Sequence, residues 1–219
     1  AASDVYKRQP LTHLKRVIHQ ASKQTNRQSH KLTRGRSFRS SDVRALRMTR
    51  PMICGEDTPK APYPVYLRGT VEHGYGRGSK QLNCATANLP VSALDDPVND
   101  PQHRLHETGV YFGYAQVRFR DGAPHPAADR EIYPMVMSLG WNPQFQNQQK
   151  SIEVHILHHY AADFYGEGMH VIVLGYIRPE RKYANLEALM DDIDVDKRVG
   201  LNSLDRPAYC AYQKEDWFS

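Results

Sequence analysis

A glycine-rich run at residues 73–80, HGYGRGSK, has the composition of a phosphate-binding loop. Its glycines, of which Gly74 is the first, alternate with other residues, so the backbone can approach phosphate oxygens without a Cβ in the way. Arg77 and Lys80 add positive charge. The run is neither a Walker A loop nor a Rossmann fingerprint, because its spacing differs and no helical pattern follows it. A glycine-rich turn without a ligand is the alternative interpretation.

The segment ATANLP at residues 85–90 offers oxygen ligands. If this segment is extended, Thr86 and Asn88 project to the same side and present a hydroxyl and an amide oxygen to one hard cation. Such a pair suits a Mg²⁺ ion whose other ligands are phosphate oxygens and water. A hydrogen-bonded turn is the alternative interpretation.

The run SIEVHILH at residues 151–158 alternates apolar and polar residues as a strand does. Its apolar residues share one face, so Glu153 and His155 share the other. A carboxylate on a rigid strand can act as general base for a substrate hydroxyl, although a solvent-facing strand side would have the same pattern. His155, His158 and His159 lack carboxylate or cysteine partners at ligand spacing, which favours structural or base-stacking roles over a metal cluster.

The basic and aromatic segment at residues 175–183, GYIRPERKY, follows a predicted strand. Arg178 or Arg181 can hold a phosphate, and Tyr183 offers a ring face to a planar ligand. A charged surface loop is the alternative interpretation.

The elements that must position these residues are predicted to be mostly strands. Asn185 is a suitable N-cap for one C-terminal helix, because apolar residues recur at helical spacing behind it. Strands without interleaved helices predict an antiparallel sheet or small barrel with this helix packed outside. The five segments with strand-like alternation and β-branched or aromatic content are residues 65–71, 109–120, 132–139, 151–159 and 170–177.

The charge distribution argues against a nucleic-acid-binding fold. The chain carries 29 Lys and Arg and 24 acidic residues in 219 positions, and residues 1–50 hold 13 of the basic residues but only Asp4 and Asp42 among the acids. The net charge is therefore +11 for that segment and about −6 for the remainder. An acidic body is a poor match for a polyanion. No apolar run approaches the roughly 18 residues that a bilayer-spanning helix needs, so we expect no membrane association.

The basic N-terminal segment is predicted to be disordered, because it is rich in Arg, Ser, Gln and Lys and poor in large apolar residues. Three explanations are open: a mitochondrial-type presequence, a basic interaction tail, or non-native sequence upstream of a start at Met48 or Met52. We expect residues 1–61 to form this extension and residues 62–219 to form one domain. A cytoplasmic location is expected, or a mitochondrial one if the segment is a presequence.

In this order, the motifs resemble those of the riboflavin kinase family of the eukaryotic monofunctional type. The resemblance runs from about residue 62 to about residue 218. It implies a six-stranded antiparallel Greek-key β-barrel with a C-terminal α-helix outside. The matching blocks are RGTV (68–71), GYGRGSK (74–80), TAN (86–88), TGVY (108–111), MVMSLGWNP (135–143), SIE (151–153), DFYG (163–166) and GYIRPE (175–180).

The resemblance also implies an activity and a set of roles. The reaction would be transfer of the ATP γ-phosphate to the 5′-hydroxyl of riboflavin, which gives FMN and ADP and depends on Mg²⁺ or another divalent metal. Glu153 would be the general base, and Thr86 and Asn88 would ligate the metal. ATP would contact Gly74, Lys80, Thr86, Asn88, Ile156, His158 and Tyr165, and the flavin would contact Arg178, Arg181, Tyr183, Trp141 and Asn147.

The sequence departs from the family pattern in two places. Residues 83–85 are Asn-Cys-Ala where the family usually has Gly-Ile-Pro, which frees φ at position 85 and loosens the segment before Thr86. Arg181 stands where Lys is more common, which keeps the charge and changes the geometry. We expect a monomer that acts on ATP and riboflavin, with no nucleic-acid or membrane partner. A flavin- or nucleotide-binding barrel without catalysis is the alternative function.

Overall fold

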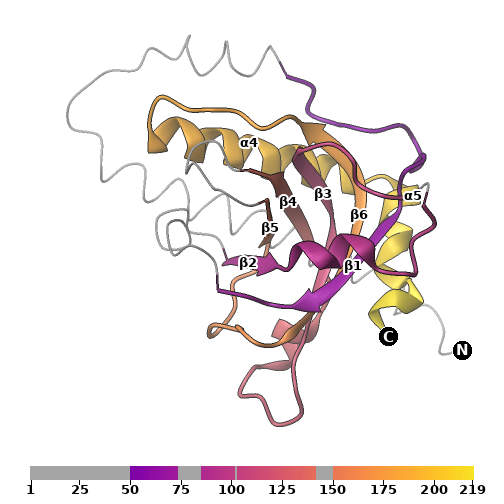
Figure 1. Cartoon of the computed structure of the whole chain (residues 1–219), viewed down its shortest axis with the longest axis vertical. Helices are drawn as coiled ribbons and strands as arrows, with labels where there is room; N and C mark the ends of the chain where they lie inside the picture. The colour runs from indigo at the N-terminus through magenta and orange to yellow at the C-terminus, as the bar shows by residue number, and fades with distance from the viewer. Residues whose placement is uncertain (1–49, 74–84, 102, 142–149) are drawn as a thin grey trace, which may run out of the picture. The chain divides into compact units, whose positions relative to one another are not determined.

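The computed structural model describes residues 50–73, 85–101, 103–141 and 150–219 (Figure 1). All five predicted strands are present, and the segment at residues 85–89, expected only to be extended, is a sixth. The strands are β1 (Val65–Thr70), β2 (Ala85–Leu89), β3 (Gly109–Arg118), β4 (Tyr133–Gly140), β5 (Ser151–Ile156) and β6 (Gly168–Arg178). The helices are α4 (Leu186–Leu204), α5 (Pro207–Cys210) and short 3-10 helices at Val91–Asp95, Ala127–Arg130, Ala211–Lys214 and Asp216–Phe218.

The strands form one antiparallel sheet in the order β1-β6-β3-β4-β5-β2. Strands β3 to β5 are sequential neighbours and β6 returns beside β3, which is the Greek-key arrangement. The sheet curls until the chain just after β1 meets β2, where the Glu72 amide donates to the Asn88 carbonyl at 2.8 Å. The predicted six-stranded antiparallel fold with an outer helix is confirmed, as a curled sheet that this bridge closes in part.

Alternation along the strands gives the sheet an apolar inner face. Met137, Ile152, Val154 and Val171 are fully buried in the main core inside the curl. The residues between them face outward, where a smaller core forms around Phe112 beneath the C-terminal helices. Thr86 and Asn88 of β2 and Glu153 and His155 of β5 belong to the outward-facing set, whereas Ile156 of β5 lies in the main core.

Helix α4 begins where the sequence predicts it to begin. Asn185 is the N-cap, and its side-chain oxygen accepts from the Ala188 amide at 2.8 Å. The helix lies on the outer face over β3 and β4. Gly200 allows this approach, because a Cβ there would lie 3.0 Å from Cγ1 of Val136. No helix of the described residues is long and apolar enough to cross a membrane.

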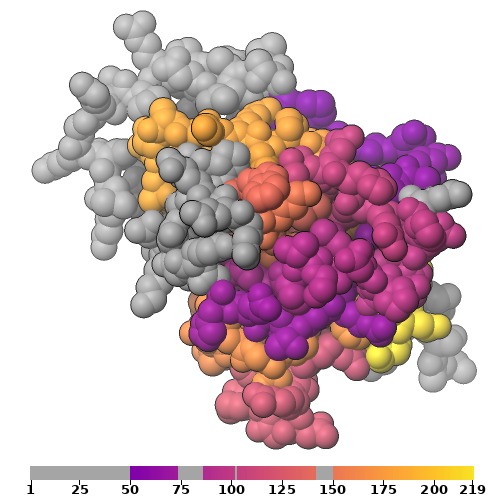
Figure 2. All heavy atoms as spheres, viewed as in Figure 1, coloured from indigo at the N-terminus to yellow at the C-terminus, as the bar shows by residue number. Residues whose placement is uncertain are grey.

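The edge of β1 is covered by the chain that follows β2. Asn99 imitates a strand partner, since its side chain accepts from the Tyr66 amide at 2.8 Å and donates to the Tyr66 carbonyl at 2.6 Å. Arg68 pairs with Asp96 at 2.7 Å beside it. In the space-filling view the indigo atoms of β1 lie against the magenta atoms of this segment (Figure 2). An edge that is covered in this way is protected from pairing with another chain.

Residues 52–56 make contacts that the sequence did not indicate. The Cys54 amide donates to Ser203 Oγ at 2.9 Å, and the Tyr209 hydroxyl donates to the Glu56 carbonyl at 2.8 Å. These residues belong to the compact unit that runs from Pro51 to Ser219. The division of the chain at residue 61 stays a prediction, because residues 1–49 lie outside the described part.

Gly113 provides a test of the tight curl of the sheet. It lies at a register shift in the pairing of β3 with β6, and a Cβ on it would overlap the Ile172 carbonyl oxygen. We expect Gly113→Ala to lower the free energy of unfolding by about 3 kcal/mol, as measured by urea denaturation. Gly122→Ala is the matched control, since its φ of 77° strains an alanine but nothing lies within 4 Å, so about 1 kcal/mol is expected. Equal losses in the two variants would contradict this account.

Candidate active site

The register of the sheet aligns one outward-facing row of residues across five strands. Asn88 of β2 lies opposite Glu153 of β5, which lies opposite Ser138 of β4. Ser138 lies opposite Val110 of β3, which lies opposite Arg178 of β6. Directly opposed residues of antiparallel strands point to the same face, so the predicted metal ligand, the predicted base and a predicted flavin residue share one surface. Neighbouring strands are ~4.8 Å apart, which puts Glu153 and Arg178 roughly 14 Å apart along the sheet.

Asn88 and Glu153 form the centre of the candidate chemistry. Asn88 is 9% exposed, and no hydrogen bond holds its carboxamide within the described part of the chain. The Glu153 side chain is half-buried, and the Ser151 hydroxyl lies 3.5 Å from its Oε1. Two neutral oxygens, from Asn88 and Thr86, next to one carboxylate are a donor set that fits Mg²⁺.

His155 lies beside Thr86 in the next opposed pair of β5 and β2. Its Nδ1 is 3.2 Å from the Thr86 hydroxyl, and the ring is almost fully buried. Burial lowers the pKa of His155 to about 4, and the positive charge of Lys197 on α4 acts in the same direction. At neutral pH the imidazole is therefore uncharged and can hold the Thr86 hydroxyl in place.

The other predicted nucleotide residues that the structure describes, Ile156, His158 and Tyr165, lie in three different surroundings. Ile156 has no exposed surface and belongs to the core inside the curl, on the opposite face from Glu153. Tyr165 stacks on His73 with ring centroids 3.8 Å apart, next to the start of the glycine-rich run. Gly74 and Lys80 in that run, like Asn147, lie outside the described residues.

His158 is held by a buried carboxylate that the sequence did not single out. Its Nε2 lies 2.8 Å from Oδ1 of Asp129, and its ring stacks on Tyr133 at 3.9 Å. The second oxygen of Asp129 contacts Nδ1 of His125 at 3.0 Å and accepts from the Ala161 amide at 3.2 Å. Burial raises the pKa of Asp129, but the bonds to His125, His158 and Ala161 outweigh it and leave that pKa lowered. No group of three or more potential metal ligands of the His, Cys, Asp and Glu types exists among the described residues.

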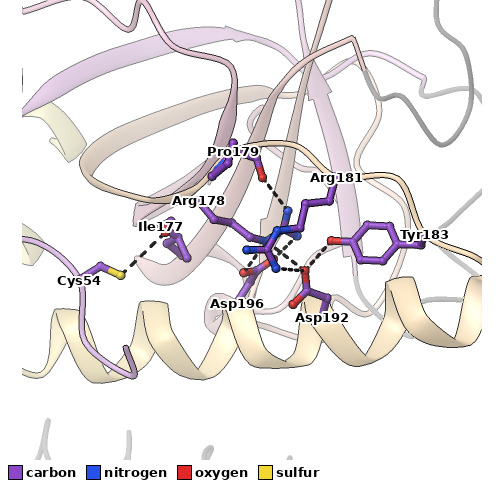
Figure 3. Close-up of polar contacts among 8 residues, drawn as sticks. All are labelled: Cys54, Ile177, Arg178, Pro179, Arg181, Tyr183, Asp192 and Asp196. Carbon is purple, nitrogen blue, oxygen red and sulfur yellow. Dashed lines mark hydrogen bonds and ion pairs between the residues drawn. The ribbon is translucent and has the colours of Figure 1, made fainter. Parts of the chain in front are cut away.

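Arg178 is tied to α4 (Figure 3). Its guanidinium pairs with Asp196 through Nη2 at 2.7 Å and through Nε at 3.1 Å to both carboxylate oxygens. The two side chains are 6% and 2% exposed. Nη1 donates to the Pro179 carbonyl at 3.0 Å. This buried pair fixes the end of β6 on the helix, so the guanidinium of Arg178 is committed to the protein itself.

Arg181 and Tyr183 approach the same helix one turn earlier. The Tyr183 hydroxyl donates to Oδ2 of Asp192 at 2.5 Å, and Nη1 of Arg181 lies 3.7 Å from the same oxygen. Burial and the bond to Asp192 both raise the pKa of Tyr183, so its hydroxyl stays protonated. Figure 3 shows the side chains of Arg178, Arg181 and Tyr183 converging on Asp192 and Asp196 of α4.

Trp141 stands at the start of the loop that follows β4. Its side chain is 48% exposed, and its amide lies 3.3 Å from Oε2 of Glu180. The Lys150 ammonium lies 5.8 Å from the centroid of the Trp141 ring. Trp141 follows Ser138 of the outward-facing row by three residues, and a half-exposed indole there can cover an aromatic ligand.

The three carboxylates that hold predicted site residues in place were not identified from the sequence: Asp129 holds His158, Asp192 holds Arg181 and Tyr183, and Asp196 holds Arg178. Asp129 follows no recognisable pattern, because its two histidine partners are 4 and 29 residues away. Asp192 and Asp196 did leave a signal. They stand four residues apart on the predicted helix, which places them on one face, directly after a loop that carries two arginines.

The burial of His155 generates a prediction of pH dependence. The unfolded chain binds a proton at this residue near its ordinary pKa of 6.5, whereas the folded chain does so only near 4. Stability is therefore lost as the pH falls from about 6.5 towards 4, by on the order of 2 kcal/mol between pH 7 and pH 5. Urea denaturation at both pH values should show a smaller loss in His155→Asn than in the wild type. His159→Gln, at an exposed neighbour, is the control, and an unchanged pH dependence in His155→Asn would contradict the account.

Comparison with known proteins identifies the family. The family model described as "Flavokinase: Riboflavin kinase" matches residues 61–204. A riboflavin kinase of Pyricularia oryzae is 43% identical over 166 residues, which cover 73% of this chain and 81% of the relative. A riboflavin kinase of Scheffersomyces stipitis is 38% identical over 184 residues, which cover 76% of this chain and 99% of the relative.

A solved structure, the crystal structure of riboflavin kinase from Trypanosoma brucei, is 27% identical with a TM-score of 0.49, and the match covers 70% of this chain and 87% of that one. The family model spans more than half of the chain, and the two relatives exceed 30% identity over most of their own length. The chain therefore belongs to the riboflavin kinase family.

Proposed function

We propose that this chain transfers the γ-phosphate of ATP to the 5′-hydroxyl of riboflavin and produces FMN and ADP. One observation carries the proposal beyond family membership. The register sets Glu153 directly opposite Asn88, one pair away from Thr86. A carboxylate and two metal-type oxygens thus meet on one face of a rigid sheet, which is the arrangement that phosphoryl transfer to a hydroxyl needs.

Glu153 is proposed as the general base. Its carboxylate accepts the proton of the 5′-hydroxyl while the hydroxyl oxygen attacks the γ-phosphorus, and the bond to the ADP oxygen breaks. The middle of β5 suits this task, because both neighbouring strands fix the position of the carboxylate. Phosphoryl transfer requires mainly positioning and charge neutralisation, so a single proton acceptor is enough.

Thr86 and Asn88 are the residues that would hold Mg²⁺. The ion, when bound, neutralises charge on the phosphate oxygens. His155 supports this pair, because its contact with the Thr86 hydroxyl fixes the direction of that side chain.

We also propose the remaining contacts to ATP and to the flavin, and the structure supports some of these residues more than others. For ATP they are Gly74, Lys80, Ile156, His158 and Tyr165, of which Tyr165 is supported by its stack on His73 beside the glycine-rich run. For the flavin they are Arg181, Tyr183, Trp141, Asn147 and Arg178. The burial of Arg178 against Asp196 supports a positioning role for it. A monomer and a cytoplasmic location are also proposed.

The direct test is FMN formation by the 219-residue chain from riboflavin, ATP and Mg²⁺, followed by chromatography and flavin fluorescence. Product that requires both ATP and the metal is expected. Flavin binding without product would reject the kinase and favour a barrel that binds flavin without catalysis.

Glu153→Gln tests the role of the base in the same assay. We expect turnover to fall by roughly 10²-fold or more, since a carboxamide cannot accept the proton, while binding of ATP and riboflavin stays within a few-fold. Glu131→Gln is the matched control, because that carboxylate is exposed two residues before the start of β4. Turnover like that of the wild type in Glu153→Gln would remove Glu153 from the mechanism.

A further inference from the structure

One carboxylate oxygen of α4 faces three donor groups, one from the last residue of β6 and two from the loop that joins β6 to α4. Oδ2 of Asp192 accepts from the Tyr183 hydroxyl at 2.5 Å, lies 3.2 Å from Nε of Arg178 and lies 3.7 Å from Nη1 of Arg181. The Asp192 side chain is only 15% exposed (Figure 3). The conformation of the loop therefore depends on this one side chain at several points.

The contacts divide the loop into a fixed half and a releasable half. Arg178 and Asp196 form a buried pair with short contacts, and such a pair does not separate without leaving a charge uncompensated. Arg181 is 49% exposed and its contact with Asp192 is long. A half-exposed ion pair of this kind adds little stability, so Arg181 can exchange Asp192 for another anion.

The charges of the cluster matter for an anionic ligand. The two guanidiniums of Arg178 and Arg181 face the two carboxylates of Asp192 and Asp196, so these four side chains together carry no net charge. A phosphate monoester carries nearly two negative charges at neutral pH. On the same outward-facing surface it is attracted by Arg181 and repelled by Asp192, whereas an uncharged flavin meets neither effect.

We propose that Asp192 is a positioning residue that holds Tyr183 and Arg181 on α4 and weakens the grip of the loop on the phosphorylated product relative to riboflavin. This inference rests on the proposed function. Asp192 thereby favours product release without touching the reacting atoms.

The test compares Asp192→Asn with Asp191→Asn in the full chain. Asparagine keeps an oxygen that can accept from the Tyr183 hydroxyl but removes the charge. Asp191 is the neighbouring exposed residue of the same helix, so its variant changes the net charge equally. Binding of FMN and of riboflavin is measured by quenching of flavin fluorescence, at low and at high salt.

We expect Asp192→Asn to bind FMN about three- to tenfold more tightly than Asp191→Asn does, and to bind riboflavin within twofold. The gain should shrink at high salt, and it should shrink further when Arg181→Gln is added to Asp192→Asn, because the guanidinium that attracts the phosphate is then absent. Steady-state turnover should fall and inhibition by FMN should strengthen, because release becomes slower.

A merely structural role for Asp192 would change the binding of both flavins equally and lower the melting temperature. An unchanged ratio of the FMN and riboflavin dissociation constants in Asp192→Asn would overturn the inference. If the wild type makes FMN and this ratio is unchanged, only the inference fails. If the wild type makes no FMN under any condition, the proposed function fails.

Discussion

The register between β2, β5 and β4 is the constraint on which the rest of the site depends. Asn88, Glu153 and Ser138 share one face only because each pair is directly opposed. A slip by one residue would turn Glu153 into the apolar interior and bring Val154 to the surface. The buried neighbours Ile152 and Val154 make such a slip unfavourable, so the packing of the core also fixes the positions of the polar residues.

Helix α4 has a second role besides covering the outer face. At its C-terminal part, Gly200 lets the helix approach β3 and β4 closely, while Asp192 and Asp196 near its middle hold the chain that leaves β6. The buried Arg178–Asp196 pair makes a weak contribution to stability in itself, because both ions lose their hydration. Its effect is on the course of the chain, because it fixes where the loop that carries Arg181 and Tyr183 leaves β6.

Much of the fold could be predicted from the sequence, because alternation and turn residues give a clear signal in strands such as residues 109–118. Strand β2 is short and mixes Ala, Thr and Asn, so it could be predicted to be extended but not to be a strand. The spacing showed that Thr86 and Asn88 share a side, and likewise Glu153 and His155. It could not show that the two pairs meet, because register depends on the three-dimensional closure of the sheet. The same limit applies to Asp129, whose partners are distant in sequence.

The single bridge between Glu72 and Asn88 has a consequence for the dynamics of the sheet. Strand β2 is fully paired with β5, but within the described residues this bridge alone joins it to the chain after β1. Local opening requires the least disruption where the fewest backbone hydrogen bonds must break. Among the described residues, this seam is therefore the line of the curled sheet that opens with the fewest broken backbone hydrogen bonds, and it runs beside the strand that carries Thr86 and Asn88. The core strands β3 and β6 can stay closed while this seam opens and recloses.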